Sequence, residues 1–535
     1  MNKTPLLFGL LCFVGVAAFS GCSNDAVDAG IVLQRGTPTE PESLDLHKAR
    51  STQALEVLRD IGEGLVAYSP TGELVPAAAE RWDVSEDGLT YTFYLRPNLR
   101  WSNGDAVVAE HFAFALRRLV APDTGAFYAN LIDALVNAPE IVAGDLEPET
   151  LGIEAKDERT LLVQLTRPTP YIIGLFTHPS TFPLHPASLE EHGDRFARPG
   201  NLLSNGAFVL DAWVPASVIA LRQNDYYWDN ANTALDGVNY HIVVQESAEL
   251  NRYRAGELHV TSTVPAENFA ELKKQFGSEL RIAPYLGLYY YGFNLTKPPF
   301  KDNVALRQAL SMAVDRETLA KKIIGRGEAP AYSWVPPGVQ NYEPTVFSFA
   351  ALSSDERIKV ARRLYKEAGY SQEKPLRFEV RYNTSDMHRK VAVALQSMWK
   401  EVLGAEATLV NEEYQVLLAN MRNADVTQVF RAAWIGDYVD AHSFLSVLRA
   451  GSAANMPRYA NEDYESLMQR AAGQTDLSRR ALYLEEAERV MLADHPIIPL
   501  YFYVSKHLIS PEVRGWGDNV LDYHYSHHLG LSATD

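Results

Sequence analysis

Cysteine is almost absent from this 535-residue chain, which contains only Cys12 and Cys22. Two thiols so close to the N-terminus cannot build a disulfide framework for the body of the protein. They also form neither a Cys-x-x-Cys motif nor a Cys/His zinc site. The fold must therefore be held together by its core and its hydrogen bonds.

Positive charge is also scarce, because 49 Lys and Arg residues stand against 67 Asp and Glu residues, for a formal net charge of -18. Such a chain repels phosphate backbones. Aromatic clusters such as Tyr289–Tyr291 lack the flanking cations that a base-stacking surface needs. On a strand their rings would alternate between the two faces, so the core is their default position. No nucleic-acid partner is expected.

The common catalytic motifs are missing. The sequence has no Gly-x-Ser-x-Gly elbow, no His-Glu-x-x-His motif, no phosphate-binding P-loop and no Gly-x-Gly-x-x-Gly turn. The segment Asp522–His528 contains imidazoles and a carboxylate that could bind a transition metal. Its spacing fits no standard site, so a surface-edge strand with a few histidines is favoured. We therefore predict a protein that is not an enzyme, with no cofactor and no metal.

The first 21 residues differ from the rest of the chain. Lys3 is followed by the apolar run Leu6–Phe19 and the small pair Ser20–Gly21, an order typical of a secretory signal peptide. The run is short for a membrane-spanning helix. The ending Phe-Ser-Gly-Cys resembles a bacterial lipoprotein processing site, which implies a lipid on Cys22. A plain signal peptide or an uncleaved anchor is the alternative.

A polar linker over residues 22–30 then leads to a body that mixes strands and helices. Alternation predicts a strand over Thr90–Leu95, and helical spacing predicts a helix over Ala109–Leu119. A longer helix is predicted over Val304–Ile324 with Asp302 as its N-cap. The apolar run Ile497–Val504 predicts a strand buried on both faces. The fold class is therefore α/β, or mixed α+β.

Several long blocks resemble the extracytoplasmic solute-binding proteins of peptide and nickel ABC transporters, family 5. The blocks occur in the family's order at residues 75–119 (including ERWDVSEDGLTYTFYLRPNLRWSNGDAVVAEHF), 205–230, 300–319, 331–338 and 498–509. This resemblance implies a two-lobed clamp of the type II periplasmic-binding-protein kind with an extra inserted domain. Lobe I would comprise residues 23–52, 186–290 and 505–535, domain II residues 53–185, and lobe III residues 291–504.

The block Arg431–Leu445 (RAAWIGDYVDAHSFL) is similar to the Arg-x-x-Trp-x-x-Asp-Tyr segment of the oligopeptide-binding branch. By that match Asp437 would bind the free α-ammonium of a peptide, and Arg431 and His388 would lie near its carboxylate end. The other substrate-binding residues that the match implies are Trp434, Ala433, Ile435, Glu40, Tyr128 and Tyr503. Ala433 stands where the branch often has Gly, and residues 439–441 replace a segment that usually contains Pro, which leaves ligand length and identity open.

The resemblance implies an extracytoplasmic, lipid-anchored monomer on a bacterial membrane that captures short extended peptides and delivers them to an ABC permease complex. A binder that tolerates many peptide sequences must recognise what all peptides share, which is main-chain NH and CO groups and two charged ends. Binding of another solute, such as a murein tripeptide, a dipeptide, haem or a nickel chelate, is the alternative. A secreted hydrolase or a surface protein in signalling or adhesion is a third possibility.

Overall fold

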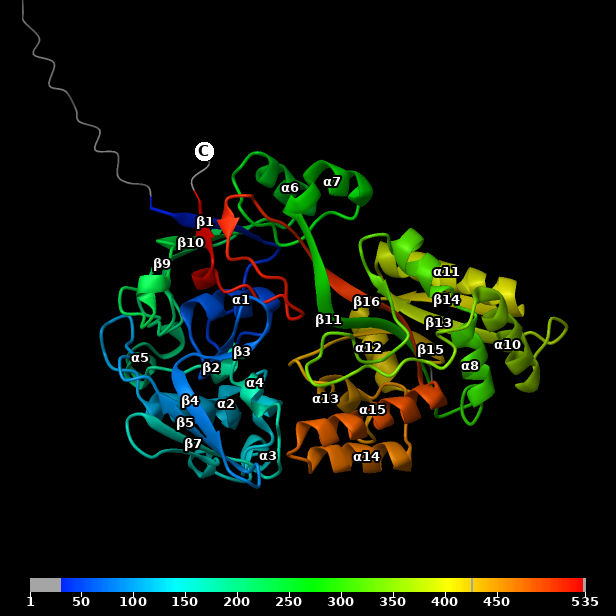
Figure 1. The fold of residues 1–535 in the computed structure, drawn as a ribbon, viewed down its shortest axis with the longest axis horizontal. Helices are drawn as coiled ribbons and strands as arrows, with labels where there is room; N and C mark the ends of the chain where they lie inside the picture. The colour runs from blue at the N-terminus through cyan, green and yellow to red at the C-terminus, as the bar shows by residue number, and fades with distance from the viewer. Residues whose placement is uncertain (1–29, 425–426, 533–535) are drawn as a thin grey trace, which may run out of the picture.

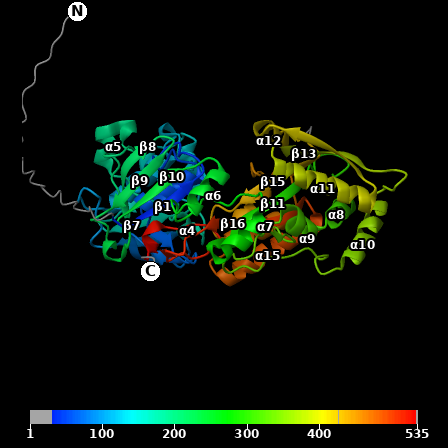
Figure 2. The same ribbon diagram turned by 90° about the horizontal axis from the view of Figure 1, so that it is seen from above.

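The computed structural model describes residues 30–424 and 427–532, which form two lobes joined by long strands (Figure 1). The expected signal peptide, Cys22 and nearly all of the expected linker lie outside the described residues. Seen from above, the two lobes lie side by side (Figure 2). In the part of the chain that is described, no helix is both long and apolar enough to cross a membrane.

The first lobe covers the residues expected for lobe I and domain II, and the second lobe covers those expected for lobe III. The first lobe contains a four-stranded sheet that is built from distant parts of the chain. Its strands, in spatial order, are β1 (Val32–Thr37), β10 (Gly237–Ile242), β9 (Val218–Gln223) and β8 (Phe208–Val214). β1 runs parallel to β10, and the other pairs are antiparallel. Helix α1 (Thr52–Ile61) packs Leu55 and Leu58 against Leu33 and Tyr240 of this sheet. Most of α1 therefore lies with lobe I, although the expected division starts domain II at residue 53.

The first lobe also contains a four-stranded antiparallel sheet. Its order is β4 (Ala79–Val84), β5 (Thr90–Leu95), β7 (Thr160–Gln164) and β6 (Ile153–Ala155). Helix α2 (Ala109–Val120) packs Phe112 and Leu116 against Phe93 and Leu161. The strand predicted over residues 90–95 and the helix predicted over 109–119 are confirmed. The lobe's smaller elements are β2 (Val66–Tyr68), β3 (Leu74–Pro76), α3 (Ala138–Val142), α4 (Ile172–Leu175), α5 (Pro186–His192), α6 (Glu246–Arg254) and α7 (Phe269–Phe276).

The second lobe is a six-stranded mixed sheet covered by helices. The sheet order is β12 (Ala329–Pro330), β16 (Ile497–Leu508), β11 (Leu280–Phe293), β15 (Val429–Ile435), β13 (Arg377–Asn383) and β14 (Glu406–Glu412). The helices are α8 (Val304–Met312), α10 (Ser354–Glu367), α11 (Asp386–Leu403), α12 (Tyr414–Arg422), α13 (His442–Leu445), α14 (Glu462–Ala472) and α15 (Leu477–Asp494). The buried strand predicted from residue 497 is confirmed as the first part of β16.

Strands β11 and β16 connect the two lobes. They pair antiparallel over most of their length, with a register shift between Pro284 and Leu288. Leu280 and Leu508 pack in a small core with α6 and α7, whereas Leu288 and Leu500 belong to the core of the second lobe. Because one strand pair contributes to two separate cores, bending at the register shift would move one lobe relative to the other.

The prediction of one continuous helix over residues 304–324 is wrong. Helix α8 ends at Met312, and a new short helix, α9 (Arg316–Thr318), begins after Asp315 and continues as a π-helical turn to Ile324. The Asp315 side chain accepts a hydrogen bond from Thr318 N, so it caps a second helix within the predicted one.

The predicted N-cap of α8 is also wrong by one residue. Asn303, not Asp302, accepts the first backbone N–H, from Leu306. Asp302 instead has a φ of 55°, in the left-handed region, whereas an N-cap residue typically has extended backbone angles.

The expected edge strand over Asp522–His528 is not formed. Its first part is irregular, and Ser526–His528 is a 3-10 turn. The Asn519 side chain accepts from Leu521 N and Tyr523 N at 3.2 and 3.1 Å, which satisfies backbone groups that a strand would pair with a neighbour. Hydrogen bonds to the Asn519 side chain therefore take the place of pairing with a neighbouring strand.

Candidate functional site

Strand β15 has one unoccupied edge. It pairs with β11 from Val429 to Ile435. Its pairing with β13 is confined to Val429 and Phe430. Across residues 30–424 and 427–532, no strand pairs with the second edge of β15 beyond Phe430. An open edge of this kind can accept main-chain hydrogen bonds from an extended ligand.

Arg431 lies at the start of this open edge among aromatic side chains. Its guanidinium carbon is 4.7 Å from the centroid of the Tyr289 ring. Nη1 donates to Asn383 Oδ1 at 3.3 Å, and Nη2 is 3.5 Å from the Tyr503 hydroxyl. Both hydrogen bonds are long. The half-buried guanidinium forms no ion pair with any carboxylate of the described chain, so it keeps bonding capacity for an anion.

His388 of α11 joins the same group of side chains through Tyr289. Its Nδ1 lies 3.2 Å from the Tyr289 hydroxyl. Burial and the nearby Arg431 charge lower the pKa of His388 to about 4. The imidazole is therefore neutral at physiological pH, and Arg431 supplies the positive charge of this end of the site. The structure brings Arg431, His388 and Tyr503 together around Tyr289.

Asp437 follows β15 at the other end of the open edge. The turn is fixed by Gly436 N, which donates to Leu286 O at 2.8 Å, and by Asp437 N, which donates to Ser443 Oγ at 3.0 Å. Trp434 Nε1 donates to Ser443 O at 2.8 Å, so the indole is anchored to the same segment.

The carboxylate of Asp437 has no hydrogen-bond or ion-pair partner in the described chain. The side chain remains open to solvent, but surrounding protein displaces enough water to raise its pKa to about 6. Tyr128, from the first lobe, lies near enough that Asp437 adds to the rise in the tyrosine pKa that burial causes. The carboxylate of the second lobe thus lies near a residue of the first.

The lobes also touch through aromatic rings. The ring of Tyr171 in the first lobe stacks on Tyr438, with centroids 4.6 Å apart, and on His442 at 4.8 Å. A cavity of about 630 Å³ beside this contact is lined by both lobes, including Arg167 and Arg480. The contact continues directly from Asp437, so movement of the lobes changes the surroundings of that carboxylate.

The remaining candidate residues are placed differently. Glu40 accepts from Trp213 Nε1 at 2.8 Å and from Ala216 N at 3.1 Å, at the turn between β8 and β9. No bond joins it to β15 within the described part of the chain. Ala433 is half-buried, and Ile435 is 47 % exposed on the open edge. Glu40 thus stands apart from the group around Arg431 and Asp437.

Two residues of this site, Tyr289 and Asn383, were not predicted from the sequence. Tyr289 has the core as its default position and is indeed buried, yet it also contacts both Arg431 and His388. Asn383 lies at the end of β13 and belongs to no sequence motif that indicates a contact with Arg431. In the segment that departs from the branch pattern, Asp440 accepts two hydrogen bonds from the Arg480 guanidinium, at 2.7 and 2.8 Å, which fix this turn without a proline.

Comparison with known proteins agrees with this architecture. The sequence model of bacterial extracellular solute-binding proteins, family 5 Middle, matches residues 73–456. The periplasmic oligopeptide-binding protein OppA of Escherichia coli K12 is 36% identical over 513 residues, which cover 94% of each chain. The probable deoxycholate-binding periplasmic protein YgiS of the same strain is 38% identical over 505 residues, again 94% of each.

Among solved structures, the unliganded open form of the murein tripeptide-binding protein MppA superposes with a TM-score of 0.85 at 35% identity. The match covers 94% of this chain and 99% of that one. The two-lobed type II architecture is therefore shared along almost the entire length. The chain belongs to family 5 of the bacterial extracellular solute-binding proteins.

Proposed function

We propose that this protein captures short peptides between its lobes and delivers them to an ABC importer. The observation that carries the proposal is that two charged side chains without ion-pair partners lie along one open strand edge. Asp437 and Arg431 lie at opposite ends of the open edge of β15, and neither has an ion-pair partner within the described residues. A zwitterionic, extended ligand supplies the missing partners of all three features.

Each end of a peptide has a matching group. The ammonium would bind Asp437 through charge-assisted hydrogen bonds, and the carboxylate would bind the fork of Arg431. Asp437 lies six residues beyond Arg431, which is at most about 20 Å of extended chain. That span favours ligands of roughly six residues or fewer.

Closure of the lobes would complete the site. A ligand held by Asp437 in the second lobe would meet Tyr128 of the first lobe, and contacts with both lobes favour the closed state. The similarity to an unliganded open form of MppA supports the view that this structure represents the open state. Binding then needs neither cofactor nor chemical reaction.

The N-terminal sequence and the relatives support a proposal for the location of the protein. We include in the proposal that residues 1–21 are removed, that Cys22 carries lipid, and that a monomer is held at a bacterial membrane outside the cytoplasm. The relatives OppA and YgiS are named as periplasmic proteins. The division into lobe I, domain II and lobe III also remains a proposal, with both lobe I–lobe III boundaries inside the connecting strands β11 and β16.

A second candidate ligand class is suggested by YgiS, whose name describes probable deoxycholate binding. Such an amphipathic acid could use Arg431 through its carboxylate. It has no ammonium, so closure over it would leave Asp437 enclosed without a partner, which is costly. The unpartnered carboxylate therefore favours a peptide.

Isothermal titration calorimetry with trialanine tests the proposal. We expect trialanine with free ends to bind, and N-acetylated trialanine to bind at least about a hundred-fold more weakly, because the charge that faces Asp437 is removed. Equal affinity for both peptides, or binding of deoxycholate without binding of any peptide, would contradict it.

A further inference from the structure

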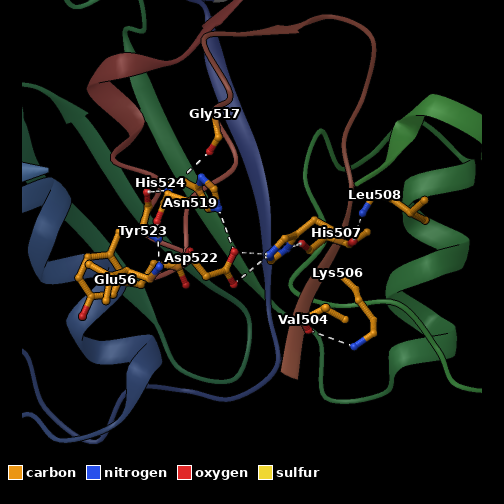
Figure 3. Close-up of polar contacts among 12 residues, drawn as sticks. Glu56, Val504, Lys506, His507, Leu508, Gly517, Asn519, Asp522, Tyr523 and His524 are labelled. Carbon is orange, nitrogen blue, oxygen red and sulfur yellow. Dashed lines mark hydrogen bonds and ion pairs between the residues drawn. The ribbon is translucent and has the colours of Figure 1, made fainter. Parts of the chain in front are cut away.

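Three side chains with metal-ligating atoms meet where β16 enters the first lobe (Figure 3). His507 Nε2 lies 2.9 and 3.1 Å from the two carboxylate oxygens of Asp522. His524 Nε2 lies 2.9 Å from Asp522 Oδ1. The three ligand atoms all lie within 4.8 Å of one another. Two imidazoles and a carboxylate are a donor set that divalent transition metals bind.

Both imidazole rings are held in place by neighbours outside the cluster. His507 Nδ1 is 2.8 Å from the carbonyl oxygen of Thr261, and an N–H donated there directs Nε2 to Asp522. Metal-binding histidines commonly have such a second hydrogen bond. The ring of Trp516 stacks on His524 with centroids 3.6 Å apart and an interplanar angle of 21°. Neither ring needs to be reoriented to present Nε2.

The carboxylate is positioned by the backbone. Asp522 has a φ of 58°, a left-handed conformation that Asp tolerates. Asn519 fixes the loop around it, since its side chain accepts from Leu521 N and Tyr523 N and donates to Tyr523 O at 2.9 Å. The three candidate ligands are therefore preorganised by contacts that involve none of their own ligand atoms.

One side of the cluster is open. A cavity of about 210 Å³ is lined by all three residues, by Glu56, which forms an ion pair with Arg35, and by Arg59, whose guanidinium carbon lies 3.5 Å from the centroid of the Tyr523 ring. Arg35 also donates to the backbone oxygen of His524 at 2.9 Å. Glu56 offsets the charge of Arg35, and the cavity has room for a water or ligand atom as a further coordination partner.

We propose that His507, Asp522 and His524 form a binding site for a divalent first-row transition-metal ion, with Zn²⁺ as the best fit. Ligand atoms about 2.1 Å from a tetrahedral ion lie ~3.4 Å apart, so the present hydrogen-bonded separations need to open by only about 0.5 Å. The protons that now lie between the ring nitrogens and Asp522 would leave as the metal enters.

This site would join the connecting strand to the end of the chain. His507 belongs to β16, whereas Asp522 and His524 come from the C-terminal segment of the first lobe. A bound ion would hold one end of β16 to that segment, on the first-lobe side of the register shift. Metal binding at this site does not require any particular ligand at Asp437.

The test uses the full chain, purified without a polyhistidine tag and stripped of metal with EDTA. We expect calorimetry to show one Zn²⁺ bound per chain, and Co²⁺ to give the visible absorption of a nitrogen- and oxygen-coordinated ion in place of the aquo ion. The variants H524A and D522N should each weaken Zn²⁺ binding at least ten-fold. The matched control H192A removes an imidazole at the end of α5, outside the cluster, and should bind Zn²⁺ like the parent protein.

Absence of Zn²⁺ binding by the parent protein would overturn the proposal, as would binding that H524A and D522N leave unchanged. Circular dichroism establishes that each variant is folded. If a variant does not fold, the Co²⁺ spectrum of the parent protein still decides, because an unchanged aquo-ion spectrum contradicts the site and a coordinated one supports it.

Discussion

Arg431 and Asp437 stand at the two ends of one open strand edge, and neither is neutralised by another residue in the described parts of the chain. Unpaired charges on the wall of an interlobe site are costly to enclose, so closure of the lobes should depend on a ligand that pairs with both. This relationship leads to separate predictions for each charge.

Replacing Asp437 with Ala should weaken the binding of peptides with a free amino end by roughly a hundred-fold or more, because a charge pair is lost in the closed site. Thermal stability should change little, since the carboxylate has no partner in the described chain to lose. Calorimetry and thermal unfolding measure the two effects. The control D463A removes an exposed acid from α14 and should bind peptide normally. Similar losses in both variants would refute the role of Asp437.

Peptide affinity should fall as the pH drops below about 6. Desolvation raises the pKa of Asp437 to about 6 in the free protein, and only the ionised carboxylate attracts an ammonium. At pH 5 about one tenth of the molecules are ionised at this residue, so affinity should be roughly ten-fold lower than at pH 7.5. The variant D437N should bind weakly at both pH values. A parent protein whose affinity is flat between pH 5 and 7.5 would contradict the assignment.

Arg431 is expected to recognise the carboxylate end of the ligand. The variant R431Q should lose about ten- to hundred-fold in affinity for a peptide with a free carboxylate, as expected for a lost charge-assisted hydrogen bond. R431K should recover only part of this, because an ammonium cannot fork onto both oxygens. C-terminal amidation of the peptide should weaken its binding to the parent protein, but should weaken its binding to R431Q only slightly further. If the two losses are instead additive in this double-mutant cycle, Arg431 does not bind the carboxylate.

Glu488 should be important for stability rather than binding. This buried residue of α15 accepts four hydrogen bonds of 2.6 to 2.8 Å, from Trp334 N, Val335 N, Thr345 N and the Tyr342 hydroxyl. Replacing it with Ala leaves these donors buried and unsatisfied, so E488A should lower the free energy of unfolding by about 3 kcal/mol or more. Denaturant unfolding checks this. E486A, which removes an exposed partner of Arg489, should change stability by less than about 1 kcal/mol.

Local patterns predicted the regular elements of this fold well. The alternation over Thr90–Leu95 and the helical spacing from Ala109 both gave the observed elements, because burial on one face determines such patterns. The predictions failed where a polar side chain bonded to the backbone. Asp315 starts a second helix inside a helical pattern, and Asn519 stabilises an irregular loop where a strand was expected.

The site was predicted only as far as the resemblance extended. Asp437, Arg431 and His388 were named from the family pattern, whereas Asn383 and the contacts of Tyr289 depend on strands that are distant in sequence. The meeting of His507 with His524 could not be predicted either, because it requires β16 to return beside the C-terminal segment. The spacing of residues within one segment does not predict which distant segment will lie beside it.

The most direct test of the account is mass spectrometry of the small molecules that leave the purified protein when it is denatured. We expect a mixture of short, chemically intact peptides with free amino ends, and we expect D437A to release far less of it. Release of a single non-peptide compound, or of peptides that all lack a free amino group, would contradict the central claim that the interlobe site recognises the charged ends shared by all peptides.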